Sequence, residues 1–257
     1  MSSLLAEAEE LERAAAEGRV RYFSRHVSAA GEVRRLLDVG CGNGYGVEAW
    51  RREGLAAFGV DISRYRLGRW VSEHRGTRPL VLADASRLPF RDGVFDLVIS
   101  SGMIEHVGVS ETSDPYTVTA HPDQSEQRAA VITELSRVRT TRGTLLVDCP
   151  NGAFPVDFWH GDRIGAFRLH PVPDALLPSL NDFRRWAARA GLAWQLEPLG
   201  GRLGFRQIGR RWWGKLLTPL MALALRVLDA CVRRDFWRLP GRFYPYLVVA
   251  FRSHGSP

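Results

Sequence analysis

The chain has 257 residues, of which 45% are hydrophobic and 25% charged, and its formal net charge is +7. This length allows a sizeable core and favours one α/β domain with an elaboration over two independent domains. The three cysteines are an odd number without metal-like spacing, which argues against a disulfide framework or a zinc site. We therefore expect a reducing compartment and no bound metal.

The N-terminus is acidic where a signal peptide would be basic and then continuously apolar, so we expect a cytoplasmic protein. Leu4, Ala8, Leu11 and Ala15 repeat at spacings of three and four residues. This repeat predicts a helix of about four turns with a narrow apolar stripe. We expect residues 1–30 to form a helical cap on the flank of the domain.

The most informative stretch runs from Leu36 to Gly44, where an apolar run ends in an acid and three glycines at alternate positions. It predicts a buried strand that stops at a tight turn, followed by a helix from Tyr45. Glycine suits such a turn because it tolerates positive φ and has no Cβ, so main-chain N–H groups can approach a ligand. A dinucleotide fingerprint would need a glycine at position 45, where Tyr45 stands.

Further apolar runs at 56–60 and 80–83 each close on an acid, and the first of these acids comes about twenty residues after the first glycine. That separation is expected of a ribose-binding carboxylate. Alternating strands and helices predict a parallel sheet with helices on both faces. Its carboxyl edge would gather Asp38, Asp61 and Asp84, although each alone could be an ordinary strand-end cap or turn residue.

The pattern Asp38-x-Gly40-x-Gly42-x-Gly44 resembles motif I of the class I S-adenosylmethionine-dependent methyltransferases. The resemblance covers about residues 33–151 and looks like the small-molecule branch of that family. It implies an α/β fold with a doubly wound, mostly parallel seven-stranded sheet, an antiparallel last strand, and S-adenosyl-L-methionine as cofactor. Carried over residue by residue, the cofactor positions are Asp38, Gly40, Cys41, Gly42, Asn43, Gly44, Asp61, Ile62, Asp84, Ala85 and Ser101. In this family an N-terminal segment often closes over the cofactor, and Tyr22 and Phe23 are candidates for that role.

Methyl transfer from a sulfonium is an in-line displacement, so the main task of the protein is to position the acceptor. A hydroxyl acceptor must also lose a proton. His106, just past the fourth strand, is the first candidate base because histidine titrates near neutrality. His160, His170 and Asp157 follow the predicted fifth strand and are further candidates. The alternative for each histidine is a packing or loop-positioning role.

The remaining elements follow from pattern. Residues 108–127 are polar and rich in turn formers, which predicts either a lid loop or a plain surface loop. We expect helices near 128–139 and 179–190, the latter capped by Ser179 or Asn181. We expect strands near 144–149, 193–199 and 246–252, the last one antiparallel as in the family.

Residues 201–243 form a basic amphipathic insertion before the last strand, where the family usually needs only a short turn. Residues 201–257 carry eleven Lys and Arg against two Asp, a local charge of +9. The uninterrupted apolar part, 216–225, is too short for a bilayer, which needs about twenty residues. We expect residues 210–240 to pack on the domain, to form a homodimer contact, or to lie on the inner face of a membrane.

These features together predict an O-methyltransferase for a glycan, a lipid-linked intermediate or a secondary metabolite. The partner is then a small-molecule or glycan acceptor. A methyltransferase acting on RNA or another polyanion is the alternative, although no recognisable RNA-binding module is present and nucleic acid is not the expected partner. A non-catalytic scaffold that keeps the cofactor fold is the third reading.

Overall fold

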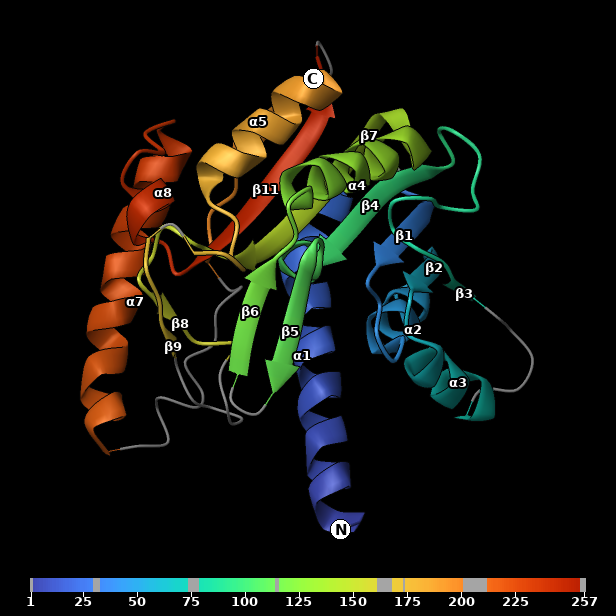
Figure 1. Ribbon diagram of the computed structural model, residues 1–257, viewed down its shortest axis with the longest axis horizontal. Helices are drawn as coiled ribbons and strands as arrows, with labels where there is room; N and C mark the ends of the chain where they lie inside the picture. The colour runs from blue at the N-terminus through green and yellow to red at the C-terminus, as the bar shows by residue number, and fades with distance from the viewer. Residues whose placement is uncertain are drawn as a thin grey trace. The chain divides into compact units, whose positions relative to one another are not determined.

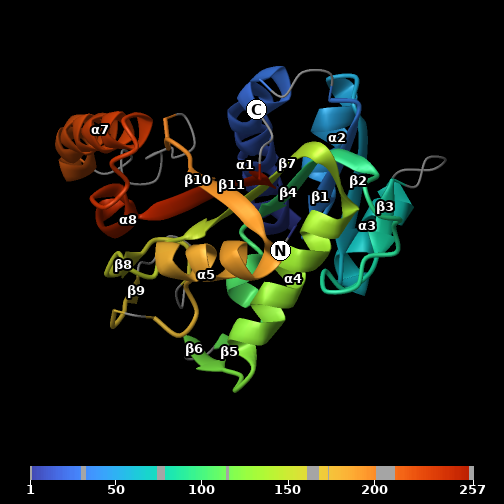
Figure 2. The same ribbon diagram turned by 90° about the horizontal axis from the view of Figure 1, so that it is seen from above.

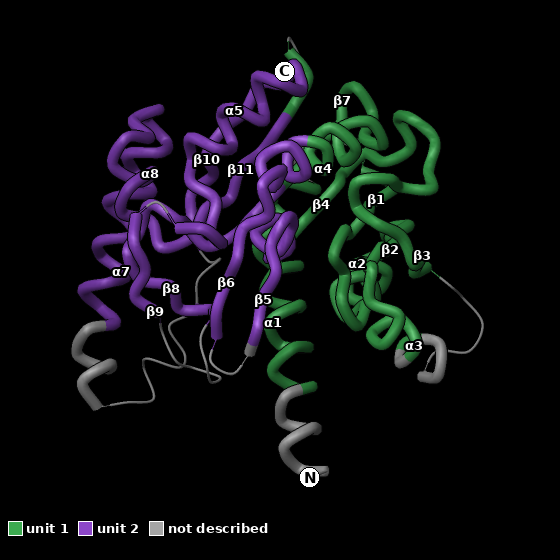
Figure 3. Tube along the Cα trace, viewed as in Figure 1, with its two compact units in different colours: residues 1–101, 130–146, 252–257 green, residues 102–129, 147–251 purple. Residues whose placement is uncertain are grey.

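The computed structural model describes residues 2–29, 33–73, 79–113, 116–160, 168–172, 174–200 and 212–254. The chain divides into two compact units (Figure 3). The first unit consists of residues 1–101, 130–146 and 252–257, and the second of residues 102–129 and 147–251.

A seven-stranded sheet runs through the chain. Its strands lie in the order β10 (Leu192–Leu196), β11 (Tyr246–Ser253), β7 (Arg139–Pro150), β4 (Phe95–Ser101), β1 (Arg35–Val39), β2 (Ala56–Asp61) and β3 (Leu80–Leu82). It is mostly parallel with one antiparallel strand, which confirms the predicted α/β fold class. Helix α4 (Gln124–Val138), strand β7 (Arg139–Pro150) and strand β11 (Tyr246–Ser253) each have residues in both units. The predicted strand at 144–149 is the C-terminal half of the longer strand β7.

The first unit begins with α1 (Ser2–Ala29), which is longer than the four turns that its apolar stripe predicts. It lies side by side with α2 (Tyr45–Arg52) (Figures 1 and 2). The remaining elements of this unit match the predicted alternation: β1 (Arg35–Val39), β2 (Ala56–Asp61), α3 (Arg64–Glu73), β3 (Leu80–Leu82) and β4 (Phe95–Ser101).

Strand register brings the predicted site residues of the first unit to one edge. Strand β1 pairs in parallel with β2 and β4, so that Val39 lies opposite Val60 and Ser100. Strand β3 pairs in parallel with β2, which places Asp61 opposite Leu82. Because these strands are parallel, the residues that follow each of them share the carboxyl edge. The middles of β1 and β4 are fully buried.

The second unit carries shorter elements. They are the 3₁₀ turn η1 (Ile104–His106), β5 (Val109–Ser113), β6 (Tyr116–Ala120), β8 (Val156–Asp157), β9 (Arg168–Leu169), α5 (Leu180–Ala190), β10 (Leu192–Leu196), α7 (Trp212–Arg233) and α8 (Pro240–Phe243). Helix α5 lies beside β10 (Figure 1). The N–H of Ser179 donates to Asp182 Oδ2 at 2.7 Å, so Ser179 rather than Asn181 caps α5.

A β-hairpin stands where the sequence predicts a loop at 108–127. Strands β5 and β6 pair antiparallel from Val109 opposite Ala120 to Ser113 opposite Tyr116 (Figure 1). Asp114 and Pro115 at its tip lie outside the described residues. The polar composition that suggested a loop is also rich in Thr, Val and Tyr, which favour strands. Its action as a lid remains a prediction.

Helix α7 occupies the C-terminal part of the insertion, and residues 201–211 lie outside the description. On a helical wheel Asp229 falls in a polar stripe with Arg226 and Arg233, which favours a surface position. In the structure it is buried and 4% exposed. Its Oδ1 accepts from the N–H of Leu199 at 2.7 Å and from the hydroxyl of Tyr244. Leu220, Leu223 and Val227 are instead more than half exposed. The described part of this helix is thus held to its own unit by its acidic residue.

Among the residues described, no helix combines the length and the apolar character that a bilayer span requires. This agrees with the short apolar run of the insertion. Contact of residues 210–240 with a membrane or a second subunit stays a prediction.

Candidate active site

The glycine loop after β1 has the backbone that its sequence predicts. Gly40, Gly42 and Gly44 have φ values of 78°, 57° and 77°, in the left-handed region that favours glycine. A Cβ at Gly44 would lie 2.7 Å from Trp70 Cε3. Gly44 is also the N-cap of α2, so the N-terminus of that helix begins directly at the loop. The first N–H groups of a helix have no acceptor within the helix, which suits the carboxylate of an amino-acid ligand.

Asp61, at the end of β2, is hydrogen-bonded to the glycine loop that follows β1. Its Oδ2 accepts from the N–H of Gly42 at 2.8 Å, and its Oδ1 accepts from the N–H of Ser63 at 2.8 Å. A carboxylate oxygen can accept more than one hydrogen bond, so each oxygen of Asp61 can accept a further bond from a ribose hydroxyl. The neighbouring Ile62 is 70% exposed. An exposed apolar side chain beside an anchored carboxylate fits the adenosine part of the predicted cofactor.

The other predicted cofactor residues have mixed surroundings. Asp84 Oδ1 accepts from the N–H and the hydroxyl of Ser86 at 2.7 Å, so Asp84 is a turn residue in addition to any ligand role. It is exposed, and Ala85 is half-buried. Burial raises the pKa of the Cys41 thiol, which makes it a packing group. Asn43 donates to Glu12 of α1, while its buried Oδ1 has no hydrogen-bond partner.

A small pocket joins two of the predicted cofactor residues. Asp38 and Ser101 line it together with residues of α1, including Arg19 and Phe23. Tyr22, the other aromatic candidate of this helix, is not among its lining residues. Arg19 and Asp38 give this pocket one basic and one acidic side chain. In the glycine loop, Asn43 Oδ1 is a further acceptor without a hydrogen-bond partner. These residues fit the charged amino-acid end of S-adenosylmethionine.

The second unit holds a cluster of titratable side chains around His106. His106 Nδ1 lies 2.6 Å from Glu111 Oε1, and Tyr116 donates its hydroxyl to Glu111 Oε2 at 2.8 Å. Burial raises the pKa of Glu111, but the hydrogen bond and charge of His106 outweigh burial and lower it. Glu111 and Tyr116 belong to the hairpin. The hairpin therefore orients the imidazole of His106, whose side chain is 42% exposed.

His160 has an equivalent carboxylate partner. Its Nδ1 lies 2.8 Å from Asp157 Oδ2, and its ring lies edge-on to the ring of His106, with centroids 5.1 Å apart. Burial lowers the pKa of His160, but the bond to Asp157 and the charge of that carboxylate outweigh burial and raise it. Arg168 also bonds Asp157 Oδ2, at 3.3 Å. Asp157 is completely buried among these partners.

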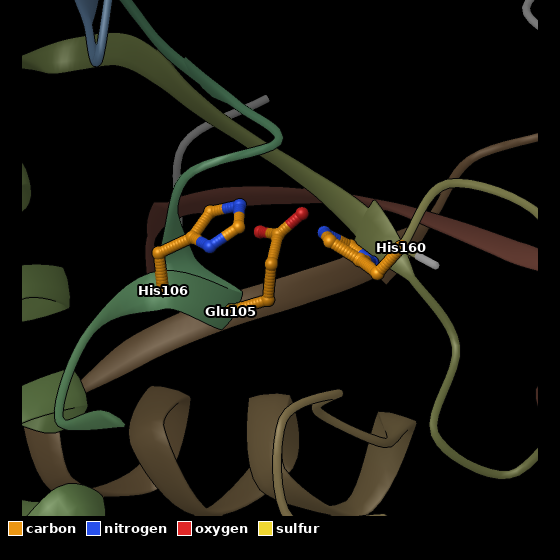
Figure 4. Close-up of side chains that lie close together, drawn as sticks. All are labelled: Glu105, His106 and His160. Atoms are coloured by element: carbon orange, nitrogen blue, oxygen red, sulfur yellow. The ribbon is translucent and has the colours of Figure 1, made fainter. Parts of the chain in front are cut away.

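Glu105 lies between the two histidines (Figure 4). The residue is 1% exposed, and its Oε2 has no hydrogen-bond partner. Burial raises the pKa of its carboxyl to about 8. A perturbed acid between two oriented imidazoles is typical of a functional site.

The structure separates His170 from this cluster. Its Nδ1 lies 2.8 Å from the carbonyl oxygen of Pro171 and 3.5 Å from Asp174 Oδ2, and its side chain is fully buried. Of the four predicted catalytic candidates, His106, His160 and Asp157 come together. Glu105, Glu111 and Tyr116, which also belong to the cluster, were not predicted from the sequence as site residues. The only signal for Glu105 was its position directly before His106.

Comparison with known proteins finds similarity over part of the chain. A family model described as a methyltransferase domain matches residues 37–147. The ubiquinone biosynthesis O-methyltransferase of Methylococcus capsulatus is 36% identical over 107 residues, 40% of this chain and 42% of that protein. The 18S rRNA (guanine-N(7))-methyltransferase of Mus musculus is 29% identical over 153 residues, 50% of this chain and 53% of that protein. The matched part thus spans about half or less of these curated relatives.

Among solved structures, the CcbJ methyltransferase from Streptomyces caelestis matches with a TM-score of 0.55. The match covers 92% of this chain and 89% of that one at 14% sequence identity. At this identity the likeness concerns the fold alone. The matched region of the family model contains the glycine loop, Asp61, Asp84, Glu105 and His106.

Proposed function

We propose that this chain is a class I S-adenosylmethionine-dependent methyltransferase that methylates a hydroxyl group of a small molecule or glycan. S-adenosylmethionine supplies the methyl group when bound at the glycine loop and Asp61. The loop backbone, the Asp61 carboxylate and the Asp38–Ser101 pocket bind and orient it. The acceptor, a glycan, a lipid-linked intermediate or a secondary metabolite, belongs to the proposal.

The observation that carries the choice of a hydroxyl is the pairing of His106 with Glu111. Because Nδ1 donates to Glu111, the Nε2 of a neutral His106 is the basic nitrogen. A hydroxyl needs such a base, whereas an amine that is already neutral does not. In the transfer the acceptor O–H bond breaks and its proton goes to Nε2. The new O–C bond forms as the S–C bond breaks, and that electron pair stays on sulfur.

The position of His106 in the chain supports its assignment. It follows the last residue of β4, Ser101, by five positions, and Ser101 itself lines the pocket with Asp38. A positioned base contributes about 10² to 10⁴-fold to the rate of a proton-coupled step. The relative from Methylococcus is named for O-methylation, which agrees with this reaction type.

The test is an acceptor screen with purified chain and S-adenosylmethionine, read by mass for the gain of one CH₂. We expect a phenolic or sugar hydroxyl to be methylated and His106→Ala to lower kcat about 100-fold or more. His121→Ala is the matched control, because His121 is paired with Ser110 on the hairpin at 2.9 Å and lies outside the cluster. Methylation of amines only, with no loss in His106→Ala, would overturn the assignment.

A methyltransferase for RNA is the second candidate. It draws on the +9 charge of residues 201–257 and on the match of half the chain to an rRNA methyltransferase. It predicts RNA binding whose affinity falls steeply with salt, because phosphate contacts release counterions. Salt-independent or absent RNA binding would remove it.

A further inference from the structure

The cluster of Glu105, His106 and His160 has the composition of a metal site. One ligand atom from each residue lies within 4.8 Å of the others. Figure 4 shows the Glu105 carboxylate between the two imidazole rings, with a nitrogen of His160 turned toward it. Three donors from two separate segments of one unit therefore converge on one point.

Glu105 is the member that lacks a partner. Its Oε2 is buried and makes no hydrogen bond. The buried guanidinium of Arg128 does not hydrogen-bond this oxygen and donates to backbone carbonyls instead. Arg128 Nη2 donates to the carbonyl oxygens of Glu105 and Leu176 at 2.6 and 2.7 Å, and Nε donates to that of Val107 at 3.0 Å. A buried oxygen without a hydrogen-bond partner is costly, and a bound cation would remove that cost.

Both histidines are prepared to act as ligands. Nδ1 of His106 is held by Glu111 at 2.6 Å, and Nδ1 of His160 is held by Asp157 at 2.8 Å. A carboxylate on Nδ1 fixes the tautomer and leaves the lone pair of Nε2 for a metal, the arrangement of most metal-ligating histidines. These carboxylates are themselves anchored, since Tyr116 bonds Glu111 and Arg168 bonds Asp157.

The donor set selects the kind of ion. Two imidazole nitrogens and one carboxylate oxygen suit first-row divalent transition metals and leave coordination positions open. Ca²⁺ and Mg²⁺ prefer sites made of oxygen ligands. Metal–nitrogen bonds of about 2.1 Å need the three donors to approach one another. His106 has room for this movement because 42% of its side chain is exposed, and the same exposure provides an entry path.

We propose that Glu105, His106 and His160 bind one divalent transition-metal ion. This departs from the expectation of no metal, which depended on cysteine spacing alone. The binding itself does not depend on the reaction. Its catalytic consequence rests on the proposed function: the ion takes over the role assigned to a free His106, lowers the pKa of an acceptor hydroxyl, and the proton leaves to solvent.

The test uses the full chain, stripped of metal with a chelator and titrated with Co²⁺ without cofactor or acceptor. We expect one equivalent of Co²⁺ per chain, with visible absorption bands of nitrogen-ligated cobalt. Glu105→Gln and His160→Ala should weaken binding at least 100-fold. Asp157→Asn, which changes only the partner of a ligand, should weaken it about 10- to 100-fold. His121→Ala should leave it unchanged.

Glu105→Gln keeps the size and shape of this buried side chain, so this variant tests binding without a large change in packing. Binding of S-adenosylmethionine by each variant reports that the glycine-loop unit is folded. No absorption at a large excess of Co²⁺, or equal affinity in folded Glu105→Gln, would overturn the metal site. Cobalt binding without methyl transfer would overturn the proposed function alone, and methyl transfer unaffected by chelation, with no cobalt bound, would overturn the metal site alone.

Discussion

Replacement of Asp61 by Asn tests the ribose assignment most directly. The two carboxylate oxygens of Asp61 accept from the N–H groups of Gly42 and Ser63, both at 2.8 Å. In the proposed complex they also accept from two ribose hydroxyls. Asn offers one oxygen, and its NH₂ group must face one of these backbone donors or turn away. The substitution therefore removes a charged acceptor and perturbs the glycine loop together.

The expected loss can be set from these contacts. A hydrogen bond to a charged group contributes about 1.5 to 3 kcal/mol. Losing one of the two ribose bonds predicts about a 10- to 100-fold increase in Kd for S-adenosylmethionine, at about 1.4 kcal/mol for each factor of ten. Asp61→Ala, which removes both acceptors, should increase Kd further. Isothermal titration calorimetry of the purified chain measures these changes.

Asp92→Asn is the matched control for this substitution. Asp92 is also an aspartate of the first unit, its side chain is 81% exposed, and it pairs with Arg137 at 2.6 Å. An exposed pair of this kind contributes little to stability. Its replacement should leave the Kd unchanged. If folded Asp61→Asn binds S-adenosylmethionine as tightly as Asp92→Asn does, Asp61 does not hold the ribose.

Three further substitutions test the fold around the sites. Gly44→Ala should lower the free energy of unfolding by at least about 1 to 2 kcal/mol in urea titrations, because φ is positive and the new Cβ would meet Trp70 at 2.7 Å; an unchanged midpoint would contradict the loop geometry. His26 is buried, and burial lowers its pKa to about 4. The unfolded chain therefore binds a proton between about pH 6.5 and 4 that the folded chain does not, so stability should fall as pH drops through this window, and His26→Gln should flatten the slope. Asp229→Ala leaves the buried N–H of Leu199 and the hydroxyl of Tyr244 without their acceptor, which costs about 1 to 3 kcal/mol for each group. The thermal midpoint of this variant should therefore fall well below that of the parent chain. An equal midpoint would show that α7 is held by other contacts.

The sequence predicted the parallel half of the sheet well because its signals are local. The first three strands come from short apolar runs that close on an acid or a glycine, the fourth ends in Ser100 and Ser101, and the run from Leu36 to Gly44 specifies strand, turn and helix start within nine residues. The hairpin was harder to predict, since the turn formers around it favoured a loop and its first strand is polar, although Tyr116 and Val118 alternate with Thr117 and Thr119 in the second strand. Helical periodicity likewise failed for Asp229, because a pattern cannot show that a carboxylate has buried donors.

The residues of the candidate site also differ in how well the sequence predicts them. The glycines and Asp61 follow directly from motif and spacing. His106 was found from its place after a strand, but its partner Glu111 lies on the hairpin that the sequence did not predict. His160 is 54 positions further along the chain. The sequence could not predict that Glu105 Oε2 lacks a hydrogen-bond partner, because only burial among folded neighbours separates this carboxylate from water.

The hairpin gives the cluster a part that can change without the sheet. Two strands of five residues each carry the side chains that aim His106, and such a ribbon is marginally stable by itself. Exchanging this ribbon between related enzymes would alter the reach and basicity of the imidazole while the glycine loop kept its ligand. Acceptor preference and donor binding would then evolve as separable traits, and hairpin grafts offer a direct way to redesign one of them.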